Sequence, residues 1–188
     1  CNEVGIFFRI VMPLSRGSVM AASVKAVKRG ASGSPGELRG DFDLTRDLGL
    51  LYANTECGIF GVLPEENRPE AVGEAIPVAR RTEVRTGKAV ILANCRGNEV
   101  CAYEIEIEKL YGGSAPTRNL LLRVTDPALI ALTGGIVQGM SGSPIVQDGK
   151  LVGAVTHVLL DDPQRGYGIL AENMLSASGM TAQSAASA

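Results

Sequence analysis

Ser141 is the residue of this sequence whose type and surroundings best suit covalent chemistry. It stands in Gly139-Met140-Ser141-Gly142, where the two glycines allow backbone angles that other residues avoid, so the segment is predicted to be a tight turn presenting the hydroxyl. A serine hydroxyl is a weak nucleophile that needs a nearby base and backbone N–H groups to hold a negative oxygen. The N–H groups of Gly139 and Ser141 are candidates for this oxyanion hole. The alternative is a glycine-rich β-turn whose serine caps a backbone group.

The base that would accept the serine proton is harder to find in the sequence. His157 is the only histidine among the 188 residues, and it lies sixteen residues after Ser141. A Ser/His/Asp triad uses a neutral imidazole for this step. Three interpretations of His157 are open: a general base, a side chain that lines the cleft, or an ordinary strand residue.

The elements that must position these residues are predicted to be short β-strands separated by Gly, Pro, Asn and Asp turns at intervals of about 8 to 12 residues. This rhythm predicts an all-β sandwich or barrel. Asp148-Gly149 is predicted to be a two-residue hairpin turn of the primed type. The predicted strands are residues 4–11, 18–28, 36–42, 58–63, 75–79, 89–94, 99–110, 120–125, 143–147, 151–160 and 166–171.

Two short helices interrupt the strands. Asp126 suits the N-cap of the first, Pro127 its first turn, and Gly134 the position beyond its end. The second is predicted at residues 171–178. The loop at residues 63–69 divides the chain into a first part, 1–66, and a second part, 67–178, and the small-residue tail 179–188 is expected to be disordered.

The composition argues against several other functions. Lys and Arg number 18 against 20 Asp and Glu, and a net charge of −2 gives no general attraction to nucleic acid. No apolar segment is long enough to predict a membrane span. With one histidine and four cysteines lacking Cys-x-x-Cys spacing, neither a metal nor a cofactor is expected. Cys95 and Cys101 could form a disulfide across a hairpin, although reduced thiols are the preferred interpretation.

The run around Ser141 resembles the Gly-Asp-Ser-Gly-(Gly/Ser)-Pro signature of chymotrypsin-like serine peptidases. More closely, residues 133–158 and 161–169 resemble the peptidase domain of the stage IV sporulation protein B family, and shorter stretches at 34–40, 54–61, 104–107 and 124–127 agree. The resemblance extends from about residue 2 to residue 175. It implies a chymotrypsin-like double β-barrel whose first barrel is incomplete at the N-terminus, with a short C-terminal helix.

The resemblance also implies roles for particular residues. Ser141 would be the nucleophile, and Asp126 would be the acidic member of the triad, a role that competes with its N-cap role. The family's histidine would lie upstream of Cys1, so this polypeptide is expected to be inactive although the full-length protein is an endopeptidase. The substrate would meet a pocket floor and a strand formed by Gly135, Thr156, His157 and Val158.

The family's function would follow from this assignment. The protein would be secreted across the forespore inner membrane into the intermembrane space of a sporulating cell. There it would cleave a membrane-associated regulator, and so activate an intramembrane protease and a late sporulation sigma factor. A PDZ domain and a membrane-targeting segment would precede the domain. An exposed sheet edge makes self-association a further expectation. The alternative function is a non-catalytic peptide-binding module with a protease-like fold.

Overall fold

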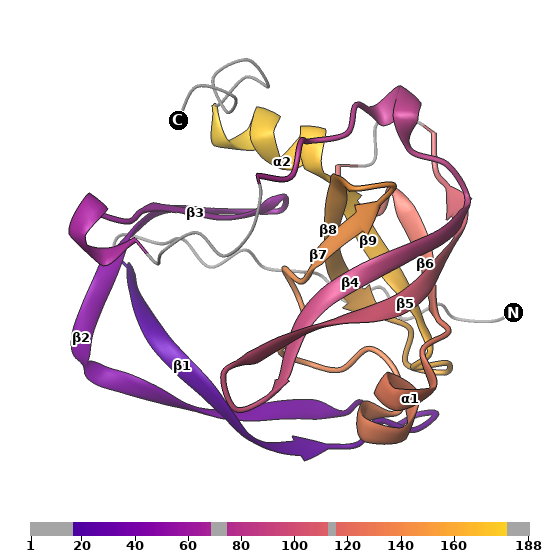
Figure 1. The fold of residues 1–188 in the computed structure, drawn as a ribbon, viewed down its shortest axis with the longest axis horizontal. Coiled ribbons are helices and arrows are strands. Elements are labelled where there is room, and N and C mark those ends of the chain that lie inside the picture. The colour runs from indigo at the N-terminus through magenta and orange to yellow at the C-terminus, as the bar shows by residue number, and fades with distance from the viewer. Residues whose placement is uncertain (1–16, 69–74, 113–115, 180–188) are drawn as a thin grey trace, which may run out of the picture.

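The computed structural model describes residues 17–68, 75–112 and 116–179. An open antiparallel sheet contains β1 (Gly17–Lys28), β2 (Glu37–Thr55) and β3 (Gly58–Val62), in the order β1-β2-β3. A closed barrel follows in the chain. Figure 1 shows the sheet and the barrel side by side, with β3 near the C-terminal helix.

The barrel is built from six antiparallel strands in the order β4-β5-β6-β9-β8-β7, and pairing of β7 with β4 closes it. Its strands are β4 (Gly87–Arg96), β5 (Glu99–Leu110), β6 (Leu120–Val124), β7 (Pro144–Gln147), β8 (Lys150–Val158) and β9 (Arg165–Leu170). The helices are α1 (Pro127–Thr133) and α2 (Ala171–Ser178), with 3₁₀ turns at Glu65–Asn67 and Arg81–Glu83. Within the described ranges, neither α-helix has the length and hydropathy required to cross a membrane.

The all-β fold class, the closed barrel and the short C-terminal helix confirm the sequence prediction, and the described strands before the barrel, β1 to β3, form an open sheet where an incomplete first barrel was predicted. The predicted helix at 171–178 is α2 itself. Asp148 and Gly149 have φ angles of 50° and 73°, which confirms the predicted primed hairpin turn. Local signals were therefore sufficient where a turn or cap fixes the backbone.

Several predicted strands differ from the structure. The strand expected at 36–42 continues to Thr55, because β1 pairs at both ends of the polar segment 43–47, with Phe42 and with Asp47, and β3 pairs from Leu50 onward. Residues 75–79 form no strand and contribute a single bridge between Val78 and Leu151. The strand expected at 151–160 ends at Val158. The predicted strand 4–11 and the tail 180–188 lie outside the described residues.

The core lies inside the barrel and is aliphatic. On β5, Ile105 and Ile107 are 1% and 0% exposed while Glu104 and Glu106 are exposed, which confirms the alternation expected for that segment. The other fully enclosed side chains come from neighbouring strands and α1, and include Ile91, Leu120, Leu122, Leu129, Ile145 and Ile169. The barrel therefore supplies a rigid support for the loops at its ends.

The open sheet has little core of its own. Within β1, β2 and β3, Gly49 alone is buried, and several large apolar side chains face solvent: Phe42, Leu44, Leu50, Tyr52, Ile59 and Val62. Exposed apolar surface of this kind favours association. Self-association of the chain stays a prediction. The boundary predicted between residues 66 and 67 falls within the 3₁₀ turn after β3.

One ion cluster fastens three adjacent barrel strands. Glu108 of β5 accepts hydrogen bonds from Arg123 of β6 and from Arg165 of β9, the latter at 2.7 and 2.8 Å. Arg123 and Arg165 stand opposite each other in the β6–β9 register, so without the carboxylate two like charges would face each other. Burial raises the pKa of Glu108, but the hydrogen bonds from both arginines outweigh it and lower the pKa.

We expect Glu108→Gln to lower the free energy of unfolding at neutral pH by about 1–2 kcal/mol, because the carboxylate is more buried than a surface ion pair. A lowered folded-state pKa stabilises the fold above the unfolded value, near pH 4.3, and that contribution is lost as the pH falls through the folded pKa. The gap between wild type and variant should therefore close in acid. Urea unfolding at several pH values measures this gap, with Glu104→Gln on the same strand as the control. A gap independent of pH would contradict the assignment.

Candidate active site

Ser141 is the second residue of the second of two consecutive β-turns, which share Met140. The N–H of Met140 donates to the carbonyl of Val137 at 3.1 Å, and the N–H of Ser143 donates to that of Met140 at 3.0 Å. The third residue of each turn is a glycine with positive φ, 98° at Gly139 and 91° at Gly142, which is the type II pattern. The glycines recognised in the sequence are thus required by the backbone, and they leave Ser141 exposed.

The residue between the two turns anchors them. Met140 is 1% exposed and belongs to the barrel core. Ser141 and Gly142, the two central residues of the second turn, are exposed to solvent. Within the described main chain, the N–H groups of Gly139 and Ser141 donate to no carbonyl. They are therefore available as donors to a ligand, which is what the predicted oxyanion hole requires, and that role stays a prediction.

The hydroxyl of Ser141 has a partner that the sequence did not reveal. Its Oγ donates a hydrogen bond to the carbonyl of Thr156 on β8 at 3.0 Å, and the N–H of Gly142 donates to the carbonyl of Val155 at 2.8 Å. The turn is therefore fastened along β8. A proton held by a carbonyl must turn toward a base before Ser141 can attack, so this geometry is a resting arrangement.

The open sheet contributes to the turn from the other side. The start of β2 pairs with the residue before Gly139: the N–H of Gln138 donates to the carbonyl of Gly36 at 3.0 Å, and the N–H of Leu38 donates to that of Gln138 at 2.8 Å. Gly36 has no room for a side chain, since a Cβ there would lie 2.5 Å from Cγ1 of Val137. The residues around Gly36 contain no pattern that predicts pairing with Gln138, which is about a hundred residues later in the chain.

The C-terminal end of β8 consists of Thr156, His157 and Val158, which lie in a strand as predicted from the sequence. All three are half-buried, and His157 stands opposite Tyr167 of β9 in the register. The hydroxyl of Thr156 donates to the carbonyl of Tyr167 at 3.1 Å. Thr156 therefore contacts Ser141 through its main-chain carbonyl, which accepts the hydrogen bond from the Ser141 hydroxyl. Contact of this segment with a substrate stays a prediction.

Asp126 is the N-cap of α1. Its Oδ1 accepts from the N–H groups of Ala128 and Leu129 at 2.8 and 3.0 Å, and its Oδ2 accepts from the N–H of Glu104 at 3.2 Å. Burial raises its pKa, but these backbone hydrogen bonds outweigh it and lower the pKa. Pro127 at the first position and Gly134 in the left-handed conformation complete the predicted helix signals. In a triad the acidic residue contacts the base, so the catalytic role of Asp126 stays a prediction.

Gly135, the predicted pocket floor, is enclosed by main chain. It is buried with a φ of 137°, and a Cβ on it would lie 2.1 Å from the carbonyl oxygen of Pro163. The N–H of Ile136 donates to that same oxygen at 2.8 Å. The position tolerates no side chain, and its role under a substrate stays a prediction.

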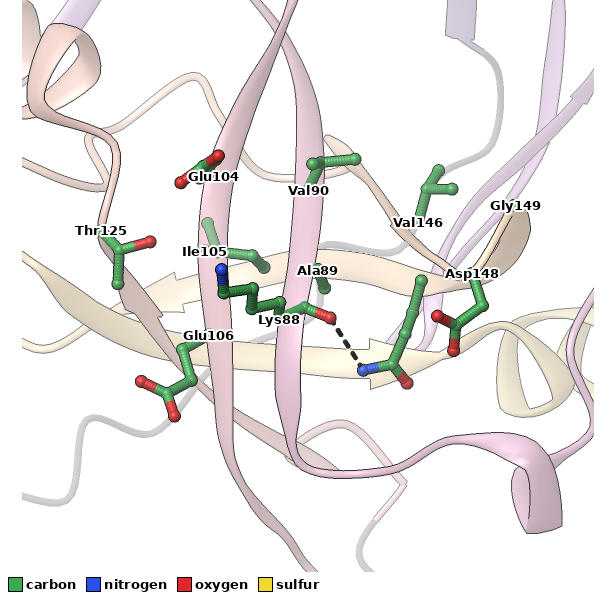
Figure 2. Close-up of a pocket in the computed structure, with 11 residues that line it drawn as sticks. Lys88, Ala89, Val90, Glu104, Ile105, Glu106, Thr125, Val146, Asp148 and Gly149 are labelled. Carbon is green, nitrogen blue, oxygen red and sulfur yellow. Dashed lines mark hydrogen bonds between the residues drawn. The ribbon is translucent and has the colours of Figure 1, made fainter.

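A cavity of about 590 Å³ lies on the outer face of the barrel, lined by β4, β5 and the β7–β8 hairpin. Figure 2 shows Glu104 and Glu106 on one strand, Lys88 on the next and Asp148 at the hairpin. None of the predicted site residues lines it. Within the described ranges, no three His, Cys, Asp or Glu side chains gather closely enough to hold a metal ion.

The barrel has six antiparallel strands, and a turn with two glycines presents a serine. This arrangement is that of the chymotrypsin-like serine endopeptidases, a class of hydrolases. The model of one family within it, SpoIVB peptidase S55, matches residues 8–175. The chain is a member of the SpoIVB peptidase S55 family.

The chain is also similar to solved structures of a bacterial protease. The active form of the Rv3671c protease from M. tuberculosis is 17% identical, with 87% of this chain and 82% of that chain covered and a TM-score of 0.48. The inactive form of the Rv3671c protease is 16% identical, with 84% and 88% covered and a TM-score of 0.47. No curated protein matches the chain.

Proposed function

We propose that this domain is the catalytic part of a sporulation signalling protease. Its substrate is a membrane-associated regulator in the intermembrane space of the sporulating cell, and cleavage activates an intramembrane protease and then a late sporulation sigma factor. The observation that carries the catalytic part of the proposal is the exposed Ser141 on its double turn in a chain of this family. Family membership supports the cellular part.

The chemistry assigns one role to each group. A base takes the proton from Ser141 Oγ, the oxygen attacks the carbonyl carbon of the scissile bond, and the negative oxygen so formed is held by the N–H groups of Gly139 and Ser141. The base then returns the proton to the leaving amine, and water repeats the sequence on the acyl-enzyme. His157 is the one histidine among the 188 residues, and the family resemblance instead assigns the base to a histidine upstream of Cys1.

Asp126→Asn separates the two roles of that residue. Asparagine keeps the oxygen that caps α1, but its amide nitrogen cannot accept from the N–H of Glu104, so the free energy of unfolding should fall by about 1–2 kcal/mol. If the carboxylate also orients the base, as the family resemblance implies, kcat should fall by about four orders of magnitude. Urea unfolding and peptide hydrolysis by the complete gene product measure the two effects. An unchanged kcat would restrict Asp126 to the cap.

A substrate trap tests the cellular part of the proposal. The Ser141→Ala variant keeps the substrate-binding strand but cannot form an acyl-enzyme, so in sporulating cells it should retain the uncleaved regulator in a pull-down. The wild-type protein, the control, should release it as two fragments. Fractionation of the same cells should place the protein between the two membranes. Normal processing of membrane-associated regulators in a strain without the protein would overturn the proposal.

A further inference from the structure

An apolar groove begins at the nucleophile turn and runs toward the C-terminal helix. Its volume is about 260 Å³. One wall is formed by Gly142 and Pro144 after the nucleophile, the floor by Leu151 and Ala154 of β8, and the far wall by Met174 and Leu175 of α2. Among the residues that the structure describes, no ionisable side chain lines it.

The groove is continuous with the candidate active site along one strand. The carbonyl of Thr156 receives the Ser141 hydroxyl, and Ala154, two residues earlier on β8, is both a groove residue and the register partner of Pro144. At about 3.3 Å per residue, this places the groove floor about 7 Å along the strand from the nucleophile contact. A Cβ built on Gly142 would meet no atom within 4 Å, so the end of the groove beside Ser141 is open.

We propose that this groove is a substrate subsite for a bulky aliphatic side chain, such as leucine, about two residues beyond the scissile bond. This inference rests on the proposed function. An extended peptide advances by the same rise as β8, so a groove about 7 Å from Ser141 matches a side chain two residues away. If the acyl side of the peptide pairs with Thr156 to Val158, the groove lies in the opposite direction, on the leaving-group side.

The lining decides the kind of side chain that binds. A charged or amide group placed among these apolar side chains would lose its water without gaining a hydrogen-bond partner, whereas an aliphatic group gains by leaving water. Met174 forms the movable part of the far wall, because an unbranched thioether adapts to different shapes. Its Cε lies 3.7 Å from the place where a Cβ on Gly58 would be, so β3 supports the wall from behind.

The test compares cleavage of a peptide library by the complete gene product carrying Met174→Lys or Met174→Asp. Wild type should prefer leucine to aspartate or lysine at the second leaving-group position by about ten-fold to a hundred-fold in kcat/KM. Met174→Lys should remove this preference, and Met174→Asp should turn it toward lysine. Ala177→Lys, an exposed change on the same helix that does not line the groove, is the matched control and should keep the wild-type preference.

A small fluorophosphonate that reacts with Ser141 but does not reach the groove separates this inference from the proposed function. It should label wild type and both Met174 variants at the same rate, and circular dichroism should show that they are folded. Equal labelling with an unchanged leucine preference in both Met174 variants would overturn the subsite while the nucleophile stands. No labelling of wild type, together with leucine-dependent peptide binding that Met174→Lys abolishes, would support the groove and reject the catalysis.

Discussion

Replacing Ser141 with alanine should abolish peptide-bond hydrolysis by the complete gene product, with kcat lower by about five or six orders of magnitude. The loss is large because the remaining oxyanion donors cannot form an acyl-enzyme without a nucleophile. Stability should hardly change, since the Ser141 side chain is exposed and makes one hydrogen bond, to the carbonyl of Thr156. The rate of hydrolysis of a fluorogenic peptide measures the loss of kcat, and fluorophosphonate labelling measures the loss of the reactive hydroxyl.

Ser143→Ala is the matched control for this experiment. Ser143 lies two residues further along the same loop, and its main-chain N–H and carbonyl make the hydrogen bonds that hold the loop, with Met140 and Val155. Alanine keeps both, so hydrolysis should stay within a few-fold of wild type. If Ser141→Ala kept its activity, Ser141 would not be the nucleophile and the proposed mechanism would be wrong. A wild-type protein that binds peptides without hydrolysing them would instead favour the peptide-binding module.

Gly135→Ala should produce the largest loss of stability among the glycine substitutions near the site, about 3 kcal/mol in the free energy of unfolding. The estimate combines a side chain forced into a φ of 137° with a Cβ placed 2.1 Å from the carbonyl oxygen of Pro163. Because residues 135–138 lead directly into the turn, relief of the clash should displace Ser141 and lower kcat/KM as well. Chemical denaturation and peptide hydrolysis measure the two effects.

Gly112→Ala provides the comparison, because a Cβ there meets no atom within 4 Å and the residue is not held at a positive φ. It should change the free energy of unfolding by no more than about 0.5 kcal/mol. Equal effects at positions 112 and 135 would mean that the close approach of Gly135 to Pro163 does not matter in solution.

The sequence was most informative where a few neighbouring residues determine the backbone. Asp126, Pro127 and Gly134 marked both ends of α1, and the two residues of the β7–β8 turn marked that hairpin, because caps and primed turns depend on local chemistry. The polar segment 43–47 misled the prediction, since β2 continues through it only because β1 pairs at both ends, with Phe42 and with Asp47. Pairing between distant segments overrides local preference there.

The candidate site divides in the same way. The glycines beside Ser141 predicted the turn because positive φ is a local requirement. The carbonyl of Thr156, the support from Gly36 and the groove beneath Met174 depend on which strands become neighbours, and the amino-acid pattern around each does not encode that choice. Asp126 shows the limit most clearly, since one motif served equally well for a helix cap and for a triad member.

The pairing of Gly36 and Leu38 with Gln138 joins the loop that carries Ser141 to the open sheet as well as to the barrel. Gly139 packs on this joint, since a Cβ there would lie 3.0 Å from that of Leu38. Separating the open sheet from the barrel would therefore break the two hydrogen bonds of Gln138, and the loop that carries Ser141 would lose this support.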